Sequence, residues 1–312
     1  MNDDEESASR DDDDDLKRMS VTERVKLREK RNGEPAGKGL STVELSDAEE
    51  EEVESRGAPR AVVLFETIRR EGVLELRRPV FSLVASGLAA GLSMGMSLAG
   101  EAIAKAAMPD KDWAHLIYAF GYTLGFIIVV LGRQQLFTEN TITVILPLLD
   151  GPKKLLKLGL VARVWAIVLV TNLLGAAAFA FFVSHTHAFP PKVMEAMHTI
   201  GMEAVKLDFW TIVQRGIVAG WLVALMVWLL PGADATRLFV ILIITYVVGV
   251  GGFSHIIAGS VEAFYVVFTG DYSIGTYFTN FLLPVFIGNV LGGSALTAIL
   301  NYGQVVAEAA ES

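Results

Sequence analysis

One histidine of this chain lies where an ionisable side chain is costly. His255 falls in the stretch GGFSHIIAGS, inside a long apolar segment at 236–268, and it is the only histidine that we place within a membrane span. A titratable group at that depth is a functional candidate by default, and imidazole can change its charge near neutral pH. His255 could therefore pair with an anion or supply a proton to it. Alternatively, it is a neutral ring that bonds a carbonyl and joins two helices.

Two other polar groups interrupt apolar segments. Thr138, in the stretch LFTEN, could offer its hydroxyl to a passing solute or to the His255 ring, and it could also cap the helix that follows. Asn289, in PVFIGNVLGG, is a lone amide that either bonds across helices or lines a pore. The residues alone leave these alternatives open.

The remaining charged and metal-binding side chains have simpler explanations. Five charged residues are expected near span ends or in pairs, where long side chains reach the membrane surface: Glu101, Arg133, Arg163, Arg215 and Glu262. Three histidines form a weak metal-binding pattern in an expected exposed loop: His185, His187 and His198. The absence of cysteine excludes disulfides and thiolate chemistry. We therefore expect no metal and no cofactor.

The sequence does not support an enzyme. Ser254 precedes His255, but adjacent side chains point in different directions and do not pair as nucleophile and base in the usual way. No GxSxG elbow, HExxH zinc pair or phosphate-binding loop is present. We therefore expect a protein without catalytic activity.

The elements that position these residues are predicted to be membrane-spanning helices. The chain has 312 residues, of which 52% are hydrophobic, and its mean hydropathy is +0.46. Several uncharged runs reach the roughly 20 residues that a bilayer span requires. Six apolar segments are predicted, at about 80–104, 114–149, 155–184, 209–230, 236–268 and 278–304.

The second and fifth segments are too long for one simple crossing, and both are interrupted. The second breaks at GRQQLFTEN, 132–140, and the fifth at GVGGFSH, 249–255. Each is the middle member of a group of three, a pattern typical of transporters built from two inverted repeats. Irregular backbone is tolerated at membrane depth where it lines a cavity. The predicted fold class is thus an all-α integral membrane bundle of six spans with an inverted 3+3 repeat.

Outside the spans the chain divides by charge. Residues 1–60 hold nineteen Asp and Glu against eleven Lys and Arg, whereas the rest is nearly neutral, so no nucleic-acid surface is expected. We predict a disordered acidic cytoplasmic tail at 1–60, an amphipathic interfacial helix at 61–79, a six-span domain at 80–306 and a short tail at 307–312. The excess of Lys and Arg on one side predicts that both termini are cytoplasmic.

Four motifs, in this order, resemble the formate/nitrite transporter family, in its divergent YfdC-like branch: LFTEN in the second span, RGIVAGWLVALMVW in the fourth, GGFSHIIAG in the fifth and LPVFIGNVLGG in the sixth. The resemblance covers about 62–304. It implies an aquaporin-like protomer in a homopentamer of the inner membrane. It also implies, in each protomer, a pore for small monovalent anions such as formate, nitrite, hydrosulfide, acetate or lactate.

The resemblance also implies roles for single residues. By motif match, His255 is the central pore histidine, Thr138 its partner and Asn289 a nearby polar residue. The implied constrictions are an outer one of Tyr122 and Val248 and an inner one of Phe126, Leu136 and Val223, with Phe137 beside Leu136. The vestibule lysine of the family would correspond to Lys206, which lies about two residues from its expected place.

Three positions depart from the family pattern. Ser254 stands where the family usually has glutamate, and Gly220 and Gly259 stand where asparagine is common. The expected function is passage of a small anion, proton-coupled or channel-like, with a pH dependence set by His255. The partners would be the anion, protons and membrane lipid. Two alternatives remain: a neutral-solute pore for water, glycerol or ammonia, and a transport-inactive membrane scaffold.

Overall fold

The computed structural model describes residues 59–149, 154–298 and 303. The chain divides into two units, 1–58 and 59–312, and only the second contains described residues. Most of the predicted acidic tail and the whole predicted segment 307–312 therefore lie outside the described residues. Throughout the described part, all regular secondary structure is helical, which confirms the predicted fold class of an all-helical membrane bundle.

The described part begins with an amphipathic helix, α4 (Ala61–Arg77). Its buried residues include Phe65 and Ile68, which pack in one apolar cluster with side chains of α7, α8 and α11. On its polar side, hydrogen bonds from Arg69 and Arg70 lower the pKa of Glu66 to about 2. The helix therefore has one face that packs on the bundle and another that suits a polar boundary.

Apolar helices of membrane-spanning length form the body of the protein. Four of them are α5 (Val80–Ala107), α6 (Ala114–Leu131), α9 (Lys154–His185) and α11 (Phe209–Leu229). A further helical run is built from α14 (Ile274–Thr276), the π-helical η2 (Tyr277–Leu282), α15 (Leu283–Val290) and the π-helical η3 (Leu291–Ala298). By length and composition, five helices of the described residues could cross a membrane.

Both predicted interruptions are present. The second segment continues after a break as α7 (Phe137–Thr143) and α8 (Leu146–Leu149). The fifth consists of α12 (Arg237–Val250) and α13 (Ile256–Phe268) with a break between them. The short helices α7, α8, α12 and α13 have 4 to 14 residues, so none of them can cross a membrane alone. α12 and α13 together make one interrupted segment, and α7 and α8 extend the segment that α6 begins.

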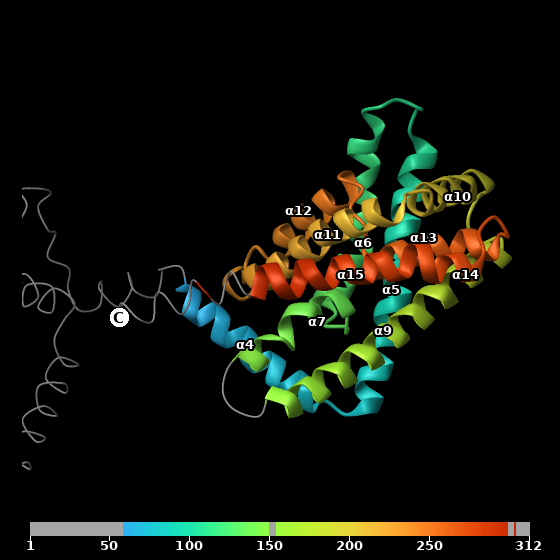
Figure 1. The fold of residues 1–312 in the computed structure, drawn as a ribbon. Helices are drawn as coiled ribbons and strands as arrows, with labels where there is room; N and C mark the ends of the chain where they lie inside the picture. The colour runs from blue at the N-terminus through green and yellow to red at the C-terminus, as the bar shows by residue number, and fades with distance from the viewer. Residues whose placement is uncertain (1–58, 150–153, 299–302, 304–312) are drawn as a thin grey trace, which may run out of the picture. The chain divides into compact units, whose positions relative to one another are not determined.

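One expectation is wrong. The region around His187 and His198 was expected to be an exposed loop, but it contains the helix α10 (Pro191–Val205). A proline at the first helical position favours helix formation there. Apolar residues then recur at helical spacing, and Val193, Met197 and Ile200 are buried against α5 and α13. Figure 1 shows α10 and α4 at opposite ends of the described body.

Glycines allow the helices to approach one another closely. A Cβ at Gly91 of α5 would lie 2.1 Å from the carbonyl oxygen of Asn172 in α9, and a Cβ at Gly292 would lie 2.0 Å from that of Ile217 in α11. Real side chains cannot occupy that space, so both packed pairs depend on glycine.

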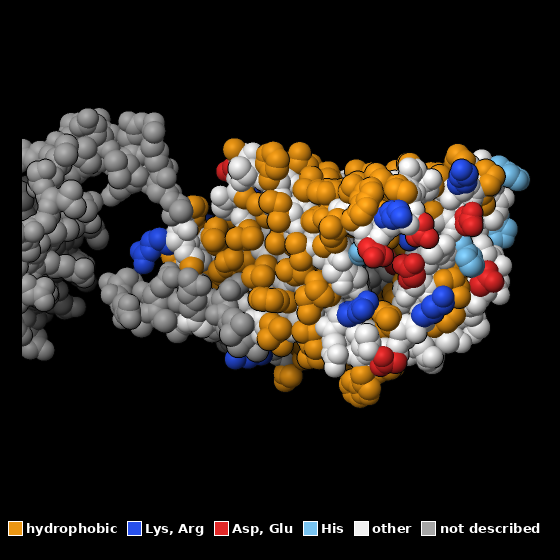
Figure 2. Space-filling view, turned by 90° about the horizontal axis from the view of Figure 1, so that it is seen from above, with side chains coloured by type: hydrophobic (Ala, Val, Ile, Leu, Met, Phe, Trp, Pro, Cys, Tyr) orange, Lys and Arg blue, Asp and Glu red, His pale blue; other side chains and the backbone are white. Residues whose placement is uncertain are grey.

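Apolar side chains cover the outside of the bundle. Figure 2 shows them over the body, with acidic, basic and histidine side chains gathered toward one end. Large exposed hydrophobics occur on successive helices, for example Phe81, Phe182, Trp210 and Ile243. An apolar surface of this extent marks contact with lipid or with other subunits.

Candidate functional site

The two helix breaks have the same local backbone structure. In the first, Arg133 has a φ of 50°, and the Gln134 amide donates to the carbonyl of Val129 at 2.9 Å. In the second, Gly252 has a φ of 59°, and the Phe253 amide donates to the carbonyl of Val248 at 3.0 Å. The two segments thus leave their helices through the same left-handed turn. This agreement is what an internal repeat would produce.

This turn yields a stability prediction. An L side chain in the left-handed region costs about 1–2 kcal/mol, so Arg133→Gly should stabilise the protein by up to about 1 kcal/mol and Gly252→Ala should destabilise it by about 1 kcal/mol. Gly159→Ala is the matched control, because that glycine lies inside α9 with nothing within 4 Å of its Cβ position. Apparent melting temperatures in detergent would measure these effects. Equal melting of Gly252→Ala and Gly159→Ala would contradict the prediction.

Each break is held by one buried asparagine of the next span. Asn289 accepts from the Ile256 amide through Oδ1 at 2.9 Å and donates through Nδ2 to the carbonyls of Ser254 and Gly216, both at 2.9 Å. Both Nδ2 hydrogens and the Oδ1 of Asn289 are engaged by backbone groups, which supports the alternative that Asn289 bonds across helices and does not line a pore. The first break has the same arrangement around a residue that sequence reasoning missed.

That missed residue is Asn172 of α9. Its Oδ1 accepts from the Phe137 amide at 2.9 Å, and its Nδ2 donates to the carbonyls of Gln135 and Gly87, both at 2.8 Å. A signal was available in the sequence, because NLLGA around Asn172 matches NVLGG around Asn289. Both asparagines satisfy backbone groups that the breaks would otherwise leave unpaired in the interior.

His255 lies at the second break, between Ser254 and Ile256, and its side chain is buried, with 1% exposed. Its Nδ1 accepts from the amides of Ile257 and Ala258, at 3.3 and 3.2 Å, and so caps α13. A nitrogen that faces two N–H donors carries no proton of its own, so the ring proton of neutral His255 lies on Nε2. Nε2 is 2.8 Å from Oγ1 of Thr138, which therefore accepts from the ring.

Aromatic and apolar side chains enclose this ring. Phe126 meets it edge-on, with ring centroids 4.9 Å apart, and Tyr122 lies one turn away with its ring 5.4 Å from that of Phe126. Leu136 and Val223 are fully buried. The surroundings of the imidazole thus offer little polar compensation for a bare charge.

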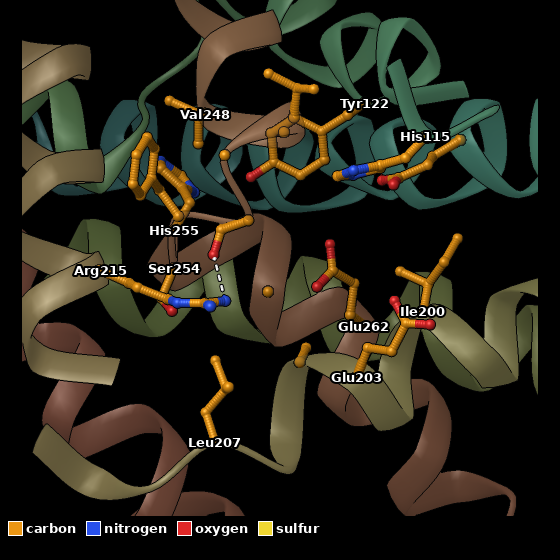
Figure 3. Close-up of a pocket in the computed structure, with 18 of the residues that line it drawn as sticks. His115, Tyr122, Ile200, Glu203, Leu207, Arg215, Val248, Ser254, His255 and Glu262 are labelled. Carbon is orange, nitrogen blue, oxygen red and sulfur yellow. Dashed lines mark hydrogen bonds between the residues drawn. The ribbon is translucent and has the colours of Figure 1, made fainter. Parts of the chain in front are cut away.

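A cavity of about 320 Å³ opens onto His255. Of the predicted constriction residues, Tyr122 and Val248 line it (Figure 3). Phe126, Leu136 and Val223 are not part of its lining. His255 also lines it, whereas the other predicted site residues lie outside its lining. Thr138 and Asn289 are buried against the second break. Phe137 packs on Trp165 and Phe286, and Lys206 is exposed at the end of α10.

The sequence profile of the family described as formate/nitrite transporter matches residues 62–303. The chain belongs to the formate/nitrite transporter family. The inner membrane protein YfdC of Escherichia coli (strain K12) is 38% identical over 252 residues, which cover 81% of each chain.

Other relatives are more distant. The uncharacterized transporter YrhG of Bacillus subtilis (strain 168) is 28% identical over 238 residues, covering 74% of this chain and 88% of the relative. The solved structure described as a pentameric formate channel with formate bound aligns with a TM-score of 0.64 at 20% identity, covering 73% of this chain and 98% of that chain. At that identity the likeness shows the fold of a formate/nitrite transporter. The protein is accordingly a multi-pass membrane protein of a transporter family rather than an enzyme.

Two departures from the usual pattern of formate/nitrite transporters have a steric explanation. A Cβ at Gly220 would lie 2.4 Å from the carbonyl oxygen of Asn289, and a Cβ at Gly259 would lie 2.6 Å from the ring of Phe281. In this member of the family, α15 and the Phe281 ring occupy the space that larger side chains would need. The third departure, Ser254, lines the cavity beside His255.

Several charged residues that were given simple explanations lie in the cavity. Glu101, Arg215 and Glu262 all line it. Glu101 and Arg215 also lie within two turns of a helix end, as expected, whereas Glu262 lies in the middle of α13. His115 also lines it and belongs to α6, so His255 is not the only histidine of a span. Side-chain direction, which decides these placements, has no signal in a single sequence.

The remaining charged and histidine candidates lie elsewhere. Arg163 donates to the carbonyl of Arg78 at 2.8 Å and so ties α9 to the junction of α4 and α5. His198 bonds Asp271 at 3.0 Å, and this hydrogen bond lowers the pKa of Asp271. Among the described residues, no three His, Asp or Glu side chains gather as a metal site.

Proposed function

We propose that each protomer is a pathway for small monovalent anions that passes His255 between the two helix breaks. The observation that carries this proposal is the bond of Thr138 to an imidazole fixed by the start of α13. Membership of the formate/nitrite transporter family and the formate channel among its structural neighbours support it. Thr138 orients the ring, while Asn289 and Asn172 hold the two breaks.

A fixed Nε2–H donor on His255 lowers the main barrier to transport, which is the cost of moving an anion into an apolar constriction. A bare anion in an apolar constriction costs many kcal/mol unless it is bonded or neutralised. The positive end of α13 acts on the ring through Nδ1, and a hydrogen bond accepted on one side polarises the donor on the other. An anion that displaces Thr138 would therefore meet a strengthened Nε2–H donor.

The geometry favours this neutral donor over an imidazolium. A second ring proton would have to lie on Nδ1, where the amides of Ile257 and Ala258 already point at it. The ring would have to leave its capping position before it could be doubly protonated. We therefore propose that His255 bonds the passing species, and that the pH dependence of transport includes proton donors in the cavity.

The assembly and topology extend the proposal. We propose a homopentamer in lipid, with both termini cytoplasmic and two inverted three-span halves. The formate channel described as pentameric supports the first part, and the matched breaks support the last. The relative YfdC, described as an inner membrane protein, supports the same location here. Arg215 rather than Lys206 would draw the anion in, because only Arg215 lines the cavity.

Reconstituted uptake tests the proposal. Purified full-length protein in liposomes should take up formate, acetate and hydrosulfide several-fold faster than empty liposomes, and faster at pH 6 than at pH 8. Glycerol and methylamine in the same panel test the neutral-solute alternative. Flux of those two solutes alone would replace the proposal with a neutral-solute pore, and no flux at all would favour a scaffold.

A further inference from the structure

Two carboxyl groups line the cavity without a hydrogen-bond or ion-pair partner among the described residues. Glu101 of α5 is 7% exposed and Glu262 of α13 is 8% exposed. Within the described part of the chain, neither accepts a side-chain or backbone hydrogen bond, and neither lies within 4.0 Å of a basic nitrogen. Figure 3 shows the Glu262 side chain pointing into the space beside Tyr122 and Glu203.

The charged groups around this pair come from five elements. They are His115 and Tyr122 on α6, Glu203 on α10, Lys105 on α5, Arg215 on α11 and His255 at the second break. Glu203 is exposed and lies 3.8 Å from Lys105, and Arg215 bonds the carbonyl of Gly252 at 3.2 Å. Acidic side chains thus outnumber basic ones in a cavity through which an anion must enter.

An acidic cavity that admits an anion is hard to reconcile with two carboxyl groups that are always ionised. A buried, unpaired carboxylate costs several kcal/mol, and the group is cheaper in its neutral form. Neutral carboxylic acids would remove the repulsion and would each carry a transferable proton. Arg215, on the wall of the same cavity, supplies a positive charge to hold an anion near them.

We infer that Glu101 and Glu262 form a proton-loading site for weak-acid anions. This inference rests on the proposed function and assigns the residues that supply the proton. One protonated carboxyl group gives its proton to the incoming anion, so the carboxyl O–H bond breaks and the neutral acid forms. The acid passes Tyr122 and Val248 to His255. The remaining carboxylate takes a proton from the solution on the cavity side, so one anion and one proton cross together.

The inference separates two kinds of anion. Formate, acetate and hydrosulfide are bases that accept a proton from a carboxylic acid to a useful extent. Chloride and nitrate are conjugate bases of strong acids and cannot be neutralised in this way. The pathway should therefore carry formate at least tenfold faster than chloride or nitrate of similar size.

Isosteric amides test the site. Glu101→Gln, Glu262→Gln and the double variant are compared with Glu203→Gln, a change in the same cavity at a side chain that is 62% exposed. Formate uptake into liposomes is followed together with the internal pH reported by a trapped dye. We expect at least a tenfold loss of formate-coupled acidification in the double variant, a smaller loss in each single variant, and less than a twofold change in Glu203→Gln.

The outcomes distinguish this inference from the proposed function. Wild-type uptake with an unchanged proton-to-formate ratio in the double variant would overturn the proton-loading site alone. Uptake of chloride equal to that of formate would do the same. A third contrary result would be formate uptake that sodium or ammonium stimulates at constant pH in the wild type but not in the double variant. That result would mean that the two carboxyl groups bind a cation instead of loading a proton. Absence of any wild-type anion uptake would overturn the proposed function itself.

Discussion

His255→Asn is expected to fold and assemble like the wild type while carrying formate about 10- to 100-fold more slowly. Asparagine is a strong helix N-cap, so it replaces the capping role that Nδ1 has for the amides of Ile257 and Ala258. It is too short to bring a donor to the position of Nε2, 2.8 Å from Thr138. Losing this hydrogen bond leaves a polar atom of the passing species unpaired in the interior and costs about 1–3 kcal/mol, which corresponds to roughly this range.

The measurement is initial formate uptake in liposomes, normalised to the amount of folded protein by size-exclusion chromatography. His255→Phe should lose uptake too, but it also loses the cap and about 1 kcal/mol of stability. Thr138→Val keeps the shape and removes the hydroxyl, and it should slow uptake less than either change at His255. Wild-type uptake by His255→Asn across pH 5 to 8 would rule out a role for the imidazole in transport.

The breaks could be predicted because their composition is unlike that of an uninterrupted span. Gly251 and Gly252 remove helix preference, and the flanking runs are too long for one crossing. Local chemistry also singled out His255 and Thr138, since few polar residues interrupt these runs. The structure adds their direct bond, 117 residues apart in sequence, which no local pattern specifies.

Other parts of the site depend on side-chain direction and on distant contacts. Asn172 was missed because a single amide in an apolar run has no local meaning until the two halves are aligned. Glu101 and Glu262 were expected near span ends, because a long charged side chain there can extend to the membrane surface. The helix α10 was missed because its apolar residues are diluted by charged ones between two predicted spans.

The matched breaks also show how one scaffold carries two different side chains. Leu136 lies between two of the three backbone groups that Asn172 bonds, those of Gln135 and Phe137. His255 lies in the same way between two of the three that Asn289 bonds, those of Ser254 and Ile256. The same turn thus presents an apolar side chain at the first break and an imidazole at the second. The backbone geometry is provided twice, and the chemistry depends on the residue placed at its centre.

Replacing either holding asparagine is expected to have the largest effect on stability. Asn289→Leu leaves the Ile256 amide and the carbonyls of Ser254 and Gly216 unpaired in the interior. Each unpaired buried group costs about 1–3 kcal/mol, so at least about 3 kcal/mol should be lost. Asn172→Leu removes the equivalent three bonds and should cost a similar amount.

Thermal unfolding in detergent measures this loss, and Asn280→Leu is the control because Asn280 is exposed on η2. On the scale of domains of this size, 3 kcal/mol lowers the melting temperature by roughly 6 to 12 °C. Function distinguishes the two sites further. Residual folded Asn289→Leu should lose uptake more completely than Asn172→Leu, because the second break carries His255 itself, whereas the first carries only its partner Thr138. Melting of both variants at the temperature of Asn280→Leu would show that the breaks hold their shape without these amides.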